Sequence, residues 1–200
     1  MRIVFAVARN GAAYYTAKES GQNHKNGGKR THMGTNAIIT SQYLASLAML
    51  EQAVLKCPES LWDSSEDKAK FWHVAYHALF YTHLYLQNTH QDFTPWHKHR
   101  ENYNYMGGRL PWPPHTPLAT DDPYDKASIL EYLAFCQQQV RERVSALDLD
   151  APSGFDWLPF GKLELQIYTI RHLQQHAGEL MERLGSRAGI EVDWVGIKYD

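Results

Sequence analysis

Apolar residues recur at helical spacing in four long segments of the 200-residue chain. The first segment covers residues 36–56, and it is followed by Cys57 and Pro58, which favour the end of a helix. The second covers residues 65–88, where Ser64 and Asp67 have the spacing of a capping box. Residues 71–86 are apolar on nearly all sides, which predicts a central helix covered by its neighbours.

Two further helices are predicted in the second half of the chain. The third begins at Asp122 and Pro123, a cap residue followed by a proline at the first helical position, and its apolar face extends to Leu147. The fourth covers residues 161–184 and ends at Gly185. Four helices of about 20 residues, with no convincing strand alternation, predict an all-α fold, a four-helix bundle.

Two segments do not follow this pattern. Residues 1–34 form a polar, Gly-rich N-terminal extension that we expect to be flexible, and Met33 is a plausible natural start, so the bundle domain is predicted at 35–200. Residues 89–121 carry five prolines and several aromatic residues, which indicates a long lid, binding loop or linker between the second and third helices. This loop is long enough to cross the bundle.

Composition excludes several classes of protein. The net charge of −2 includes no basic excess, so we expect no nucleic acid partner, and no apolar run approaches 18 residues, so we expect no membrane span. The first eight residues are a short apolar stretch, which leaves a secretory signal as the minor alternative to a cytoplasmic protein. Cys57 and Cys136 are far apart and are interpreted as reduced, buried thiols.

The eleven histidines include two pairs at a spacing of four residues, where both imidazoles share one helix face. His172 and His176 lie at the edge of the apolar face of the fourth helix, and His73 and His77 lie in the most apolar stretch of the second. Two such pairs in one bundle favour metal binding over hydrogen-bonded core histidines. The Glu-containing motifs of zinc proteases and di-iron bundles are missing, so a site of imidazoles alone remains, which suits Zn, Ni, Cu or Fe.

The remaining histidines have ordinary interpretations. Two lie in the N-terminal extension, and the others are expected to be core or exposed polar residues: His83, His90, His97, His99 and His115. Loop histidines could also cover a site.

The sequence resembles the DinB/YfiT-like superfamily in two places. Residues 172–180 are similar to the family element H-x-x-x-H-x-G-Q-L, with Glu179 in place of the usual Gln. Residues 77–86 resemble the family's single histidine on the second helix, followed by an aromatic-Leu ending, and this register selects His77 over His73. The resemblance implies an up-down-down-up bundle, a divalent metal on three histidines and often a homodimer. Characterised members include thiol-dependent transferases and isomerases that use bacillithiol, mycothiol or glutathione.

The resulting hypothesis is a metal-dependent enzyme of the thiol S-transferase or hydrolase type. Its expected metal ligands are His77, His172 and His176, with Zn as the first candidate and Ni or Fe as alternatives. Tyr81, four residues after His77, is the candidate catalytic hydrogen-bond donor, with bundle packing as its alternative role. The expected partners are a small-molecule substrate, for instance a low-molecular-weight thiol, and a second copy of the chain.

Two other hypotheses remain open. One is a non-catalytic dimeric bundle with a structural, sensing or vestigial metal site, which a fourth protein ligand, His73, would favour. The other is a helical binding module that uses the aromatic loop as its contact surface.

Overall fold

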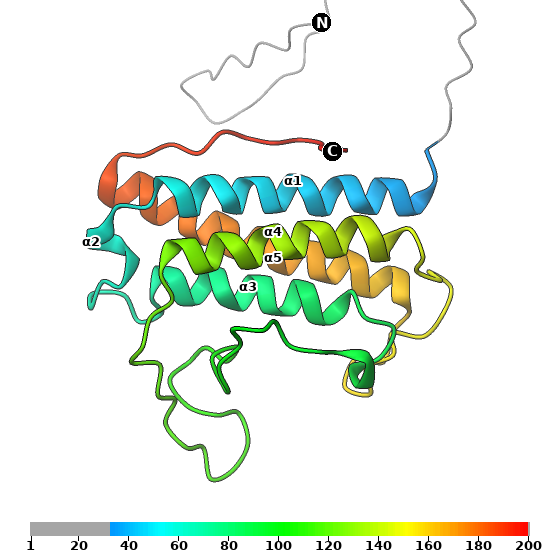
Figure 1. The fold of residues 1–200 in the computed structure, drawn as a ribbon, viewed down its shortest axis with the longest axis horizontal. Coiled ribbons are helices and arrows are strands. Elements are labelled where there is room, and N and C mark those ends of the chain that lie inside the picture. Colours follow the sequence, from blue (N-terminus) through cyan, green and yellow to red (C-terminus); the bar gives the residue numbers. More distant parts are fainter. Residues whose placement is uncertain (1–32, 200) are drawn as a thin grey trace, which may run out of the picture. The chain divides into compact units, whose positions relative to one another are not determined.

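The computed structural model describes residues 33–199 of the chain. The residues of the predicted N-terminal extension up to His32 lie outside this range. The described part is helical and contains no β-strand, only two isolated bridges. Four long helices make up a bundle (Figure 1), together with a short helix and one 3-10 turn: α1 (Thr35–Lys56), α2 (Glu59–Trp62), α3 (Phe71–Tyr85), η1 (His90–Asp92), α4 (Lys126–Val144) and α5 (Lys162–Ala188).

The central helix is α3, as the sequence predicts. Thirteen of its 15 residues are buried, and the two that are only half-buried are His77 and Tyr81. These two lie four residues apart and therefore share one face of the helix. Large aromatic side chains fill the core around α3, among them Trp72, Tyr76 and Tyr132, none of which is exposed. The half-buried face of α3 is thus the place where the bundle interior can be reached.

Side-chain hydrogen bonds show how neighbouring helices run. The amide of Asn36, at the start of α1, donates to the carbonyl of Val144 at the end of α4, and Lys126, at the start of α4, donates to the carbonyl of Cys57 after α1. The helices α1 and α4 are therefore antiparallel.

The same reasoning applies to α5. Lys162, at its start, donates to the carbonyl of Gln87 after α3, and Arg183, near its end, donates to the carbonyl of Ala69 before α3, so α3 and α5 are antiparallel. The helices α1 and α5 run in the same direction, since they are joined by hydrogen bonds from Tyr43 to Gln166 and from Gln174 to Met49.

By length and composition alone, α1 passes the test for a helix that could cross a membrane. However, 61% of its apolar stretch is buried inside the protein, and core helices of soluble proteins can have the same length and composition. A search for uninterrupted apolar runs in the sequence does not single out α1 as a possible membrane span, because Ser41, Gln42 and Ser46 interrupt the apolar residues of this helix.

The predicted start of the second helix is wrong by six residues. The helix begins at Phe71 rather than at residue 65, and a turn occupies residues 63–70. Ser64 and Asp67 do not cap this helix, because their side chains accept hydrogen bonds from Arg187 near the end of α5. The Ser64 hydroxyl still accepts locally from the Glu66 amide, but both side chains are bound to a distant helix instead of starting this one.

Other helix ends also differ from the sequence prediction. Helix α4 is capped by Asp125, whose carboxylate accepts from the Ser128 amide, while Asp122 forms an ion pair with Arg100. Helix α5 continues past Gly185 to Ala188 and ends at Gly189, which has a φ of 66° and is the left-handed residue of the C-cap.

The long connection between α3 and α4 spans residues 86–125 and lies along the open side of α3 (Figure 1). Three of its groups bond to successive polar side chains on α3. The Tyr103 carbonyl lies 2.7 Å from His73 Nε2, the His99 imidazole 2.6 Å from the Tyr76 hydroxyl, and the Asn104 carbonyl 2.7 Å from His77 Nδ1. The loop therefore covers the side of α3 that carries these three side chains.

Candidate metal centre

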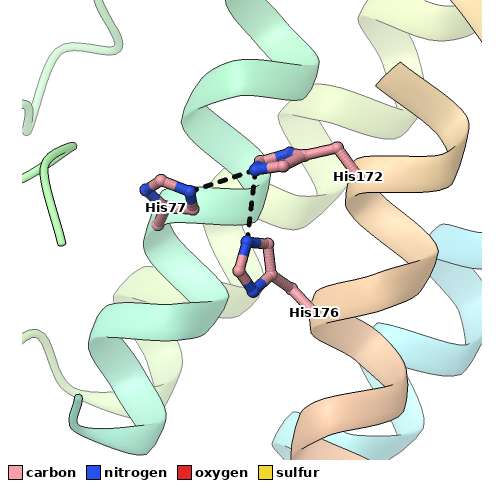
Figure 2. Close-up of side chains that lie close together, drawn as sticks. All are labelled: His77, His172 and His176. Carbon is pink, nitrogen blue, oxygen red and sulfur yellow. Dashed lines mark hydrogen bonds between the residues drawn. The ribbon is translucent and has the colours of Figure 1, made fainter. Parts of the chain in front are cut away.

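Three imidazoles from two helices converge at one point in the bundle (Figure 2). His77 comes from the half-buried face of α3, and His172 and His176 come from adjacent turns of α5. The Nε2 atom of His172 lies 3.1 Å from Nε2 of His77 and 3.2 Å from Nε2 of His176. One nitrogen from each ring lies within 4.8 Å of the other two. The three predicted ligands are therefore brought together.

The partners of the outer ring nitrogens determine which nitrogen faces this point. Nδ1 of His77 faces the Asn104 carbonyl, and Nδ1 of His176 lies 3.2 Å from a carboxylate oxygen of Glu179. A carbonyl or a carboxylate can only accept, so both Nδ1 atoms carry the proton. In the neutral rings, Nε2 of His77 and of His176 then presents a lone pair toward Nε2 of His172.

This donor set fits a metal ion better than a closed hydrogen-bond network. His172 can offer only one Nε2 proton, which can bond well to Nε2 of either His77 or His176 but not to both. The lone pair of the other ring is then left without a hydrogen bond. In a tetrahedral zinc site with Zn–N distances of about 2.0–2.1 Å, ligand nitrogens are about 3.3 Å apart. The two separations at His172, 3.1 and 3.2 Å, are close to that value.

Burial keeps two of the three imidazoles neutral, those of His77 and His172. It lowers the pKa of His77 to about 3, against a smaller opposite effect of the Asn104 carbonyl, and it lowers the pKa of His172 to about 4. Only the neutral form of imidazole has a lone pair to give to a metal. At neutral pH both rings are therefore ready to bind one without first losing a proton.

One side of the cluster is open. His77 and His172 line a cavity of about 920 Å³ between α3, α5 and the long loop. A ligand in this cavity could reach the point on which the imidazoles converge. A site with three protein ligands and an accessible fourth position is the arrangement of catalytic rather than structural zinc sites.

Tyr81 lies beside the cluster, as its position one turn after His77 predicts. The centre of its ring is 4.8 Å from that of His77 and 5.6 Å from that of His172, and it lines the same cavity. Burial raises the pKa of Tyr81 to about 12, while the Asn104 side chain lowers it in part. The phenol is thus protonated at neutral pH and can donate a hydrogen bond.

His73 does not join the cluster. Its ring is buried, stacks on Trp72 with ring centres 5.0 Å apart and bonds to the Tyr103 carbonyl. His73 is therefore not placed to act as a fourth metal ligand, and its contacts are those of a hydrogen-bonded core histidine. His83 is a core residue of the same kind and lies 3.2 Å from the hydroxyl of Tyr132.

Two residues of the site, Asn104 and Glu179, were not identified from the sequence, and His99 was named only in a less favoured role. His99 was expected to be an exposed loop residue, with cover over a site as the alternative, and it is half-buried and lines the cavity. Asn104 contributes a backbone carbonyl, for which no residue type gives a signal. Glu179 had a signal, because it lies three residues after His176 on the same helix face.

Comparisons of the chain with family models, with curated proteins and with solved structures found no match.

Proposed function

We propose that this chain binds a divalent metal through His77, His172 and His176 and uses it in catalysis on a small molecule. The observation that carries the proposal is the convergence of three Nε2 atoms beside an open cavity. Zinc is the first candidate, with nickel or iron as alternatives, because three neutral imidazoles suit all of these metals. When bound, such a metal lowers the pKa of a ligand water or thiol toward neutrality and so supplies a nucleophile.

The chain's own residues have definite roles in this proposal. Asn104 and Glu179 hold the Nδ1 protons of two ligands and thereby fix the ring orientations, as groups behind metal-binding histidines generally do. Tyr81 is placed to donate a hydrogen bond to a reacting group in the cavity. The reaction class we favour is transfer to or from a low-molecular-weight thiol, or hydrolysis.

A place in the DinB/YfiT-like superfamily is part of the proposal. The helix directions support it: α1 and α5 run one way and α3 and α4 the other, the up-down-down-up order that the resemblance implies (Figure 1). The 40-residue connection between α3 and α4 is long enough to return the chain to the starting end of the bundle. Homodimer formation and a cytoplasmic location stay predictions from the sequence.

The competing hypothesis is a non-catalytic bundle with a structural metal site. A closed set of four protein ligands would support it, but the candidate for the fourth ligand, His73, bonds to a loop carbonyl instead. The cavity at the cluster supports the catalytic proposal.

Metal content tests the proposal directly. The untagged protein is stripped with a chelator, reloaded separately with Zn²⁺, Ni²⁺ or Fe²⁺, dialysed and analysed for metal per chain. We expect about one ion per chain in the wild type and a large loss in His172→Ala and in His176→Ala. His115→Ala, in an exposed part of the loop, is the matched control and should keep its metal. A trace of metal in the wild type that is unchanged in both ligand variants would refute the proposal.

A further inference from the structure

The cavity beside the histidine cluster has an inner and an outer end. The inner end is defined by His77 and His172, both of them half-buried. The outer end is defined by two indoles, Trp112 from the long loop and Trp157 from the connection before α5, which are 46% and 54% exposed. A molecule that fills the cavity would therefore reach from the cluster to the end that these exposed indoles line.

Nearly half of the residues that line the cavity are Phe, Tyr or Trp. Besides Phe80, the wall contains six Tyr and Trp side chains: Tyr81, Tyr85, Tyr105, Trp112, Trp157 and Tyr168. The two outer indoles are held by neighbouring tyrosines. Trp112 meets Tyr105 edge-on with ring centres 5.1 Å apart, and Trp157 Nε1 donates to the hydroxyl of Tyr85 at 3.4 Å. The outer end is thus a preformed set of aromatic faces.

The charges on the lining have one sign. No Lys or Arg lines the cavity, and its single carboxylate is that of Glu101. The neighbouring Arg100 pairs with a different carboxylate. Its guanidinium lies 2.9 Å from Asp122 and stacks over the ring of Tyr124. In the metal-free protein an anionic ligand would find no basic side chain on this wall, whereas a cation would find both a carboxylate and several aromatic faces.

We propose that the outer end of this cavity binds an organic cation, so that the substrate carries an ammonium or other onium group at one end. Aromatic faces attract such cations through the ring quadrupole, and desolvation strengthens the attraction. The other end of the molecule then reaches the histidine cluster, which is why this inference rests on the proposed function.

Three small probes that differ mainly in charge test this inference. Choline is the cation, 3,3-dimethylbutan-1-ol is its neutral carbon isostere, and 3,3-dimethylbutanoate is an anion of similar shape. Dissociation constants are obtained by ligand-observed NMR titration, with metal-loaded and with metal-free protein. We expect choline to bind roughly fivefold or more tightly than the neutral isostere, and the anion to bind most weakly to the metal-free protein.

Variants of the outer end show where the preference arises. Replacing both Trp112 and Trp157 by Leu should lower the ratio of choline to isostere affinity toward one, while Trp194→Leu, in the exposed tail, should leave it unchanged. Glu101→Gln should weaken choline roughly two- to fivefold and leave the neutral isostere unaffected, which a merely structural role would not produce.

The outcomes separate this inference from the metal site. Equal binding of choline and its isostere, or a preference that survives in the double indole variant, overturns the cation site even if metal is bound. A cation preference in a protein that takes up no metal keeps the cation site and refutes the proposed metal enzyme.

Discussion

At mildly acidic pH, His77 and His172 are expected to release almost no protons when the site binds a metal ion. Only neutral imidazole binds a metal, and an ordinary histidine with a pKa near 6.5 is about nine-tenths protonated at pH 5.5. Burial lowers the pKa of His77 to about 3 and that of His172 to about 4. Both rings are therefore already neutral at pH 5.5, and neither has a proton to release when a metal binds.

The magnitude follows from these pKa values. Between pH 7 and pH 5, two ordinary imidazoles would weaken metal binding roughly 600-fold through competition with protons and would release about 1.8 protons at pH 5.5. With pKa values of about 3 and about 4, the same two ligands cost only about a tenth of the affinity over this range. The sign is the usual one: acid weakens binding, and through these two ligands it does so only as the pH approaches 4.

Isothermal titration calorimetry measures this quantity. Zn²⁺ is titrated into metal-free protein at pH 5.5 in two buffers of different ionisation enthalpy, and the difference in heat gives the number of protons released. The control is a repeat of the titration with His172→Ala, which should show little binding heat. Release of two or more protons per ion by the wild type would contradict the burial-based explanation of the neutral ligands.

Three substitutions test the surroundings of the site and the fold. Glu179→Ala should weaken metal binding about tenfold or more, because His176 loses its Nδ1 partner, and Glu179→Gln should restore much of the affinity in a chelator competition. Lys162→Met should destabilise the protein by about 2–4 kcal/mol in urea unfolding, since the buried ammonium serves three loop carbonyls. Gly154→Ala should cost about 3 kcal/mol or more, because its φ is 83° and a Cβ would lie 1.8 Å from the Asn88 carbonyl oxygen.

Each of these has a result that would count against it. Undiminished metal affinity in Glu179→Ala would mean that the carboxylate does not orient the ring. Unchanged urea midpoints in Lys162→Met or Gly154→Ala would mean that the connection before α5 does not have the packing described here.

The three converging imidazoles could be predicted because helical geometry is local. His172 and His176 share a face of α5 whatever surrounds it, and the same rule places Tyr81 next to His77 on α3. Spacing alone did not distinguish His73 from His77. The structure distinguishes them: a loop carbonyl bonds to one nitrogen of each ring, and the other nitrogen of His77 lies 3.1 Å from His172 on α5.

The helix ends and the orienting groups depend on contacts between distant segments. Ser64 and Asp67 have the spacing of a cap, but Arg187 on α5 binds them, and the helix begins later. The Asn104 carbonyl that orients His77 belongs to the backbone, so no side-chain pattern could identify it. Such features become predictable only after the packing of the loop on the bundle is known.

The loop also explains why aromatic and histidine residues gather on one side of α3. A helix whose outer face met water would need polar residues there, yet α3 is buried at all but two positions. Residues 86–125 supply the missing cover, and they bond to the polar tips that α3 does carry, on His73, Tyr76 and His77. The cover is incomplete only over His77 and Tyr81, where the cavity lies. The segment that makes α3 an interior helix is therefore also the one that leaves the histidine cluster accessible and forms much of the wall a substrate would meet.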